Sequence, residues 1–467
     1  MPDASAIPGS FRDPGGRVHR VGDRIFRTVM PSAAAAFEAV RASGLHDRLI
    51  ERGVLIRHAQ VDPAELGEAA AGAACVLEHP RLPFVSYPYE WPFAALKAAA
   101  LLQLDLLLEA LAAGFTLSDA TAYNVQFVGA EPVFIDTLSL RPYEEGSYWL
   151  GHRQFCEQFL NPLLLRSHLG LDYHAWYRGT LEGIPAADLD RLLPWWRKLS
   201  PNVLMHVSMQ SRLQAGEGAR EKAEAAVKRG GLSRKGFTDI VRGLRVWIDA
   251  LAPAGLRNTP FAHYADDNTY SSEDTAMKAR FVADHIGATK PAVVMDLGCN
   301  TGRFAQAVLE GGAGYVVGID GDTGALDRAY AQARRHQRRL LALHMNLSDP
   351  SPDQGWSQGE RAGLARRSAE SCDAVLALAL VHHLSIAGNV PLARVVQWLV
   401  SLAPRGVVEF VPKSDPMVQR LLALREDIFP DYDEGAFVRA LEERSEIVAT
   451  ASVPGTGRRL FQFRSKP

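Results

Sequence analysis

Short apolar runs separated by helix-forming segments dominate the C-terminal part of the chain. The runs are 292–295, 315–319, 340–345, 373–378 and 406–411. Between them lie stretches with the apolar spacing of amphipathic helices, such as 303–309 and 323–335. Strands that are apolar throughout are buried on both faces, as in parallel sheets covered by helices. The pattern therefore predicts an α/β fold with a mostly parallel sheet for residues 263–467.

Near its C-terminal end, the sequence predicts two adjacent antiparallel strands with no helix between them. Residues 446–453 and 459–463 form two strand-like runs, and Pro454-Gly455-Thr456-Gly457 separates them. Two such runs around a glycine-containing turn favour a β-hairpin. With the five apolar runs, the hairpin brings the predicted sheet to seven strands and gives it an antiparallel end.

The N-terminal half shows a mixed α and β pattern. Alternating runs at 17–21 and 24–29 flank Gly22-Asp23, which predicts a hairpin. A helix is expected from about Ser32 to Ser43, and further strands at 53–56 and 74–77. A long apolar helix at 93–113 carries Lys97, Asp105 and Glu109, charges that are costly in lipid, so we expect a buried helix and no membrane span.

These patterns divide the chain into four segments. Residues 1–16 are rich in proline and glycine and are expected to form a flexible arm. Residues 17–140 form an α+β region, and residues 141–262 read as a helical continuation and a linker. The α/β domain then spans residues 263–467.

Composition narrows the class of protein. The chain has 467 residues and a net charge of −2, which gives no strong signal for nucleic-acid binding. Its four cysteines are far apart and contain no C-x-x-C pair, so we expect no metal site and a reducing, cytoplasmic location. The first residues lack the pattern of a signal peptide. The oligomeric state stays open.

A glycine-bounded turn at the end of the first apolar run carries the clearest chemistry. Asp296 closes the strand, Gly298 and Gly302 bound the turn, and a helical run follows. A ligand of an open α/β sheet lies at the carboxyl ends of such strands, where a helix N-terminus offers free N–H groups. Asp320 ends the next strand, about 20 residues after the turn, where an acid can accept hydrogen bonds from two ribose hydroxyls.

This D-x-G-x-x-x-G turn with its second acid resembles the cofactor site of class I S-adenosylmethionine (SAM) methyltransferases of the bacterial two-domain, nodulation-protein type. The resemblance implies a Rossmann-like seven-stranded sheet with a terminal hairpin, and SAM as the cofactor. It implies that SAM contacts the turn and Asp320, residues at the ends of the third and fourth strands, and two residues of the segment 263–290 before the first strand. These residues are Asp296, Gly298, Cys299, Asn300, Thr301, Gly302, Asp320, Asn346, Leu347, Leu378, Lys278 and Tyr270.

The same resemblance places the substrate at the ends of the fourth and fifth strands. His382, His383 and Glu409 lie there and are the candidate catalytic residues. A neutral histidine can accept a proton from an attacking hydroxyl or amine near pH 7. The expected reaction is methyl transfer to an oxygen or nitrogen of an unidentified acceptor, a small molecule or saccharide in preference to protein or RNA. The alternatives are a histidine pair with a structural role and a pair that binds a metal with Glu409.

A second motif lies in the N-terminal half. Asp119 and Asn124, followed by Asp136 at a strand end, resemble the catalytic loop and metal-binding aspartate of the protein-kinase-like fold. The motif departs from that family: no His-Arg precedes Asp119, and Arg27 is the nearest cation where a lysine is usual. Three interpretations stay open: a degenerate kinase-like fold, an active kinase, or turn-capping side chains with a buried carboxylate.

Two rival functions therefore remain beside the methyltransferase. One is a nucleotide-binding, kinase-like regulator fused to a methyltransferase. The other is a SAM-binding module without turnover.

Overall fold

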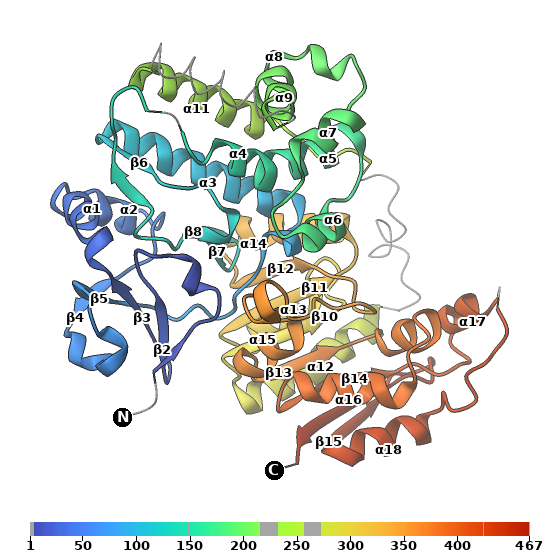
Figure 1. Ribbon diagram of the computed structural model, residues 1–467. Helices are drawn as coiled ribbons and strands as arrows, with labels where there is room; N and C mark the ends of the chain where they lie inside the picture. The colour runs from blue at the N-terminus through green and yellow to red at the C-terminus, as the bar shows by residue number, and fades with distance from the viewer. Residues whose placement is uncertain (1–3, 148, 215–231, 256–271, 424, 467) are drawn as a thin grey trace.

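The computed structural model describes residues 4–147, 149–214, 232–255, 272–423 and 425–466. The chain builds a small antiparallel sheet first, then a helical region, and last a large mixed sheet (Figure 1). Tyr270 lies outside the described residues.

The C-terminal sheet has seven strands in the order β12-β11-β10-β13-β14-β16-β15. The strands are β10 (Val293–Leu297), β11 (Tyr315–Asp320), β12 (Leu340–His344), β13 (Ala374–Ala377), β14 (Arg405–Phe410), β15 (Ser445–Ser452) and β16 (Arg459–Ser465). Strands β10 to β14 are parallel, and β16 pairs antiparallel with both β14 and β15. The predicted parallel sheet and terminal hairpin are confirmed.

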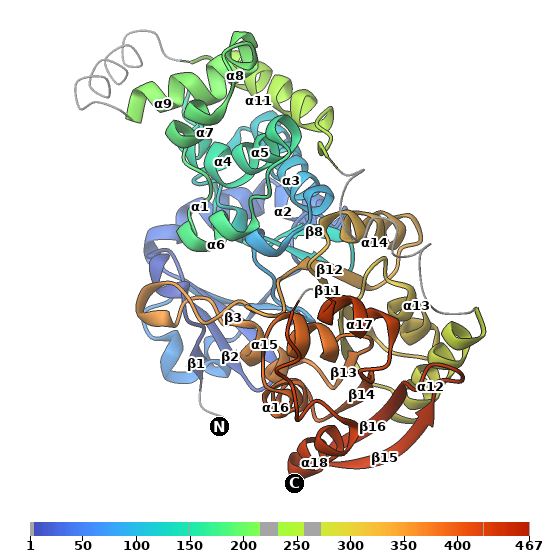
Figure 2. The same cartoon turned by 90° about the vertical axis from the view of Figure 1, so that its right-hand side faces the viewer.

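Helices connect these strands and flank the sheet (Figure 2). They are α12 (Ser272–Thr289), α13 (Arg303–Glu310), α14 (Thr323–Arg335), α15 (Leu364–Ser371), α16 (Leu392–Leu402), α17 (Pro416–Leu422) and α18 (Glu434–Arg444). Helices α12 and α13 pack together, and α16 packs with α15 and α18. The buried faces of the strands explain their apolar composition, because β10, β13 and most of β11 are buried along their whole length.

The N-terminal sheet is antiparallel, with the strand order β1-β2-β3-β5-β4. Its elements are β1 (Ser5–Ala6), β2 (Val18–Val21), β3 (Arg24–Val29), α1 (Pro31–Ala42), α2 (Leu45–Glu51), β4 (Ala59–Val61) and β5 (Cys75–His79). The hairpin around Gly22-Asp23 is confirmed. The predicted strand at 53–56 is wrong: the strand lies at 59–61, and Leu55 only forms an isolated bridge with Phe134.

The described part of the segment expected to form a flexible arm, residues 4–16, makes backbone contacts with the N-terminal sheet. Strand β1 pairs with β2, and the Ile7 N–H donates to the Val18 carbonyl at 2.8 Å. Gly16 lies so close to the Thr28 carbonyl that a Cβ atom would collide with it. Gly16 therefore lets two backbone segments approach each other closely. A glycine-rich composition does not distinguish such a close approach from flexibility.

A long apolar helix, α3 (Phe93–Ala112), organises the helical region. Most of it is buried among the elements that follow, because apolar side chains cover most of its surface. These are β6 (Phe115–Leu117), β7 (Val125–Val128), β8 (Glu131–Phe134), β9 (Leu140–Pro142), α4 (His152–Phe155), α5 (Asn161–Leu169), α6 (His174–Thr180), α7 (Ala186–Leu192), α8 (Pro201–Val203), α9 (Met209–Gln214) and α11 (Arg234–Asp249). No helix among the described residues combines the length and the apolar composition that a membrane crossing needs.

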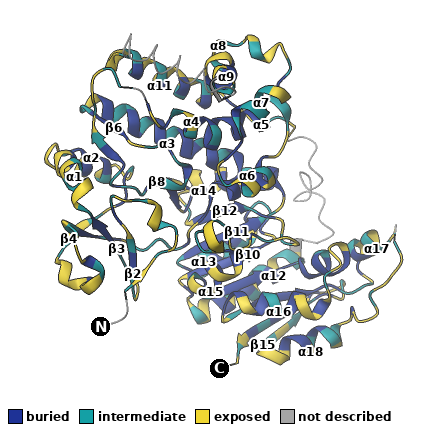
Figure 3. Cartoon of the chain, in the orientation of Figure 1, coloured by how far each residue is buried: buried dark blue, intermediate teal, exposed yellow. Residues whose placement is uncertain are grey.

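The two halves share one continuous hydrophobic core (Figure 3). At their contact, the Arg367 guanidinium of α15 forms a buried ion pair with Glu90, and one of its N–H groups donates at 2.9 Å. The Ala94 N–H, at the start of α3, donates to Asp327 of α14 at 2.9 Å. The segment before α3 and the first turn of α3 are therefore fixed to the C-terminal domain by charged and polar contacts as well as by apolar packing.

Candidate functional site

The ends of four parallel strands meet at one edge of the large sheet. Leu297 of β10 pairs with Ile319 of β11 on one side and with Ala377 of β13 on the other. Asp320 then pairs with His344 at the end of β12. The register brings the glycine turn, the second acid and the residues after β12 and β13 to the same edge, as the sequence predicts.

The turn after β10 is shaped by positive backbone φ angles. Gly298 has φ +78°, Asn300 φ +49° and Gly302 φ +82°. The Asn300 side-chain oxygen accepts the Thr301 N–H at 2.8 Å, which supports its left-handed conformation. Gly302 precedes α13 and makes no side-chain cap hydrogen bond, and a helix start of this kind can offer N–H groups to a ligand.

Asp320 is tied to the turn by its carboxylate. One oxygen accepts the Asn300 N–H at 2.8 Å and the other accepts the Asp322 N–H at 2.8 Å. Burial raises the pKa of Asp320, and these two N–H groups oppose that rise. An ionised carboxylate has about four lone-pair sites, so Asp320 retains capacity for two ribose hydroxyls.

Asp296 lies beneath the turn with a buried carboxyl group. Its Oδ2 atom has no hydrogen-bond partner among the described residues. Burial raises the pKa of Asp296 to about 7, and the nearby charge of Asp320 adds to the rise. A buried polar atom without a partner needs an explanation, and a polar group of a ligand at this strand end would supply one.

The remaining predicted cofactor residues occupy different positions around this edge. The Cys299 side chain is buried against Gly318 of β11, so Cys299 faces the inside of the sheet and contributes only its backbone to the turn. Leu378 is buried directly after β13. Asn346 is exposed, and its side-chain oxygen accepts the Ser348 N–H at 3.0 Å, while Leu347 is half-buried beside it.

Lys278 has a different partner from the one expected. Its ammonium group lies 2.5 Å from Glu409 Oε1, and both side chains are buried. Glu409 also accepts the Ala379 N–H at 2.9 Å, and Arg458 lies 3.6 Å from it. Burial raises the pKa of Glu409, which Lys278 opposes. Glu409 is therefore held in a buried charge cluster next to the end of β13, and Lys278 belongs to that cluster. The cofactor contact expected of Lys278 stays a prediction.

The paired histidines lie at the same strand end, with ring centres 4.2 Å apart. His382 is 0% exposed, and neither ring nitrogen has a hydrogen-bond partner among the described residues. Burial lowers its pKa to about 3, and the His383 and Lys278 charges add to this. His383 is half-buried, and burial lowers its pKa as well. Both imidazoles are thus neutral near pH 7.

A second group of polar side chains lies in the N-terminal half, in a cavity of about 1310 Å³. The Asn124 amide nitrogen lies 3.2 Å from Asp119 and 3.2 Å from Asp136. Arg27 of β3 pairs with Asp136 at 2.9 Å and with Asp13 at 2.5 Å. Burial raises the pKa of Asp119 to about 6, and the Asp136 charge adds to the rise. All three residues of the predicted motif are therefore brought together, far from the glycine turn in sequence.

Sequence reasoning missed part of this cavity. Its wall includes residues 355–371, which belong to the connection between β12 and β13 of the large sheet. Arg361 of that connection lies over the Tyr123 ring at 3.9 Å. Residues 8–16, assigned to a flexible arm, line another side. The three arginines Arg361, Arg366 and Arg367 were the available signal, but Tyr123 and Glu90, which Arg361 and Arg367 contact, are more than 200 residues away in the sequence.

Comparison with known proteins gives three findings. A family model described as a methyltransferase domain matches residues 295–408, which span β10 to β14. The nodulation protein NoeA of Rhizobium meliloti (strain 1021) is 44% identical over 463 residues, which cover 99% of this chain and 96% of that protein.

Two solved methyltransferases align with less than half of the chain. One is the N-methyltransferase NodS of Bradyrhizobium japonicum WM9 with S-adenosyl-L-homocysteine, at 13% identity and a TM-score of 0.32, covering 45% of this chain and 95% of NodS. Another is the magnesium protoporphyrin IX methyltransferase of Synechocystis PCC 6803, at 17% identity and a TM-score of 0.32, covering 44% and 94%.

The site fits SAM as its cofactor. The glycine turn and the uncapped start of α13 offer N–H groups to a carboxylate, Asp320 offers acceptors to ribose hydroxyls, and Asp296 has an oxygen without a partner. The matched domain covers these residues. The chain therefore belongs to the family of the nodulation protein NoeA, and it is a SAM-dependent methyltransferase.

Proposed function

We propose that this enzyme transfers the methyl group of SAM to an oxygen or nitrogen of a small molecule or saccharide. One observation carries the proposal. The glycine turn and Asp320 lie at strand ends next to those that hold His383 and Glu409. SAM supplies a methyl group on a positively charged sulfur, which a nucleophile can attack in line. A net charge of −2 supports a small acceptor over a nucleic acid.

The protein's own part is to hold the acceptor and manage its proton. His383 is neutral near pH 7 and half-buried, so it can accept a proton from a hydroxyl or ammonium group that becomes the nucleophile. His382 is fully buried behind it, and we assign it a packing role beside Lys278 and Glu409. We also propose a cytoplasmic location, which is consistent with four free thiols.

The test begins with cofactor binding. Asp320→Ala should abolish measurable SAM binding by calorimetry, because it removes the ribose acceptors and the carboxylate that holds the Asn300 N–H. Glu310→Ala is the matched control: Glu310 is an exposed acid at the far end of α13, and its loss should leave SAM affinity unchanged. Equal affinity in Asp320→Ala and the wild-type protein would overturn the assignment.

Turnover is tested with methyl-labelled SAM and a bacterial lysate separated into protein, RNA and small-molecule fractions. Label in the small-molecule and saccharide fraction is the expected result, and label in protein or RNA would refute the acceptor class. SAM binding without label in any fraction, including extracts of the organism that encodes the chain, would favour a binding module without turnover.

We propose a second ligand site, for a magnesium-bound nucleotide, in the N-terminal cavity. Asp13, Asp119, Asp136 and Asn124 offer hard oxygen ligands of the kind that Mg²⁺ prefers, and Arg27 adds a cation among them. The order of β3, α1, β5, α3 and the loop with Asp119 supports a degenerate kinase-like fold. The proposal concerns binding and does not include phosphoryl transfer.

Thermal unfolding with and without Mg·ATP tests this site. Mg·ATP should raise the melting temperature of the wild-type protein and leave that of Asp136→Asn unchanged. Asp47→Asn, an exposed substitution on α2 in the same region, should respond like the wild type. The same shift in Asp136→Asn and the wild type would show that the nucleotide binds elsewhere.

A further inference from the structure

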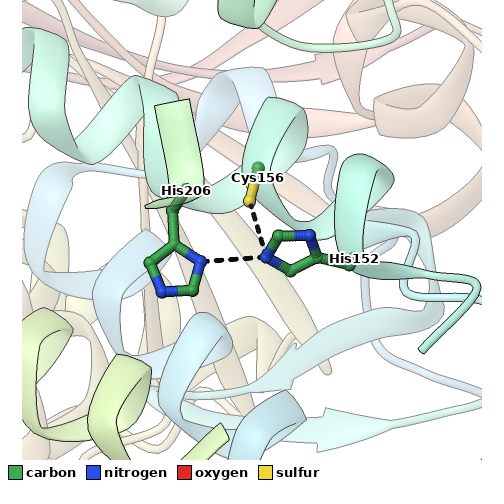
Figure 4. A group of neighbouring side chains, drawn as sticks. All are labelled: His152, Cys156 and His206. Atoms are coloured by element: carbon green, nitrogen blue, oxygen red, sulfur yellow. Dashed lines mark hydrogen bonds between the residues drawn. The ribbon is translucent and has the colours of Figure 1, made fainter. Parts of the chain in front are cut away.

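Three side chains with metal-binding atoms meet in the helical region, away from both sites described above. His152 comes from α4, Cys156 from the π-helical turn that continues it, and His206 from a second π-helical segment before α9. Their ligand atoms all lie within 4.8 Å of one another (Figure 4). His152 Nε2 lies 2.9 Å from His206 Nδ1 and 3.6 Å from Cys156 Sγ.

The backbone of both segments departs from the α-helix where these residues occur. His152 and Cys156 are four residues apart, so they project from the same face of their helix. Cys156 begins the π-helical turn Cys156–Leu160, and His206 is at the centre of the π-helical turn Leu204–Ser208. Such turns are uncommon and often occur at functional sites because the extra residue re-aims side chains. Cys156 and His206 each belong to one of them, and both contact His152.

The distances between the three ligand atoms agree with tetrahedral coordination of one ion. Zinc lies about 2.3 Å from a cysteine sulfur and about 2.0–2.1 Å from a histidine nitrogen, so tetrahedral angles place sulfur and nitrogen about 3.6 Å apart and two nitrogens about 3.4 Å apart. The observed sulfur–nitrogen distance is 3.6 Å, and the two imidazole nitrogens, 2.9 Å apart, would separate by about half an ångström.

A neighbouring amide can orient one of the two histidine ligands. The Gln210 side chain lies 2.8 Å from His152 Nδ1. A rotation of its amide would place the oxygen there, where it can accept the Nδ1–H of a metal-bound imidazole. His152 is only half-buried, which leaves a way in for an ion.

We propose that His152, Cys156 and His206 bind one zinc ion. One thiolate and two imidazoles are the ligands of a borderline-soft divalent metal, and a fourth position stays open for water. Metal binding would release the Cys156 thiol proton to solvent and replace the hydrogen bond between the two imidazoles with bonds to the ion.

The site has a structural consequence for the N-terminal cavity. Gln154 and Gln158 belong to the same segment as His152 and Cys156, and they hold the loop that follows Asp119. The Gln154 oxygen accepts the Ala120 N–H at 3.0 Å, and the Gln158 oxygen accepts the Ala122 N–H at 2.8 Å. An ion that fixes this segment to His206 therefore steadies the Asp119 loop from behind.

The test uses the full-length protein and two readouts. Elemental analysis of protein purified without chelators should find one zinc per chain. Replacement of zinc by Co²⁺ should give the absorption of a tetrahedral site with a thiolate-to-cobalt charge-transfer band. Cys156→Ser should lose the band and the bound zinc, whereas Cys75→Ser, which removes a thiol outside the cluster, should keep both.

A milder variant separates metal loss from misfolding. Gln210→Ala keeps all three ligands and should weaken zinc affinity about tenfold, with an unchanged circular dichroism spectrum. The proposal is overturned if the wild-type protein holds no zinc and gives no charge-transfer band with Co²⁺. It is equally overturned if the band persists in Cys156→Ser, since the thiolate then comes from another cysteine.

Discussion

At the scale of single residues, Asp296 shows how burial sets the protonation of a side chain. Its folded pKa of about 7 lies above that of an unfolded aspartate, about 3.9, because desolvation and the Asp320 charge both disfavour ionisation. The neutral form is therefore stabilised by folding. That stability is present below the unfolded pKa and is lost as pH rises through the folded pKa.

The first prediction concerns Asp296→Asn, measured without SAM. Asparagine does not ionise, so the variant should gain stability relative to the wild type as pH rises from 5 to 8. The gain should be roughly 2–3 kcal/mol, since each pKa unit corresponds to about 1.36 kcal/mol. Urea unfolding of both proteins across this range gives the difference, and a difference that is flat with pH would contradict the assigned burial effect.

The second prediction concerns the proton on the methyl acceptor. His383→Asn should lower kcat by about 10²-fold or more, because it removes the neutral imidazole, while SAM affinity changes little. The measurement needs an acceptor from the labelling experiment. His336→Asn, an exposed histidine of the same domain, is the matched control and should keep wild-type kcat. A normal kcat in His383→Asn would assign the histidine pair a structural role.

At the scale of elements, two glycines illustrate opposite constraints. A Cβ atom on Gly406 of β14 would collide with the Val375 carbonyl of β13 and come within 2.8 Å of the Phe463 ring. A Cβ atom on Gly243 of α11 would meet nothing within 4 Å, and this residue sits inside a helix. The same substitution should therefore have opposite effects at the two positions.

The third prediction compares these substitutions directly. Gly406→Ala should destabilise the protein by about 1–3 kcal/mol, because the β13–β14 pair has to move apart. Gly243→Ala should stabilise it by about 0.5–1 kcal/mol through helix propensity. Chemical denaturation measures both. Equal effects in the two variants would show that the packing of β14 does not constrain position 406.

Sequence-based prediction succeeded for some elements and failed for others. Strands β10, β11, β12, β13 and β14 are apolar because both faces are buried, and this made them and the glycine turn predictable. Strand β4 was misplaced because its first two residues are exposed and carry no pattern. The Arg27–Asp136 and Lys278–Glu409 pairs join residues more than 100 positions apart, and no local spacing indicates such partners.

At the scale of the whole molecule, the two halves contribute to one hydrophobic core. Glu90 and Arg367 are the charged pair buried where they meet, with 1% and 5% of their side chains exposed. Arg367 also donates to the Val85 carbonyl at 2.7 Å and lies over the Tyr87 ring. A buried charge that loses its partner costs far more than a surface pair.

The fourth prediction follows from this contact. Glu90→Gln should reduce the free energy of unfolding by about 3 kcal/mol, since the Arg367 charge stays buried without a counter-ion. It should do so in a single transition seen both in N-terminal and in C-terminal tryptophan signals. Glu370→Gln is the control: it removes an exposed acid on α15, the helix that carries Arg367, and should change stability by less than about 1 kcal/mol. Two separate transitions would show that the halves unfold independently.

The shared wall of the N-terminal cavity has one more consequence. Residues 355–371 line that cavity and also lead directly into β13, whose end forms part of the methyl-transfer site. If a ligand shifts this connection, and the shift reaches the end of β13, the affinity of the domain for SAM changes by some factor. Thermodynamic linkage requires SAM to change the affinity for that ligand by the same factor. The cavity and the cofactor site would then report each other's occupancy, and a single titration in either order measures the coupling.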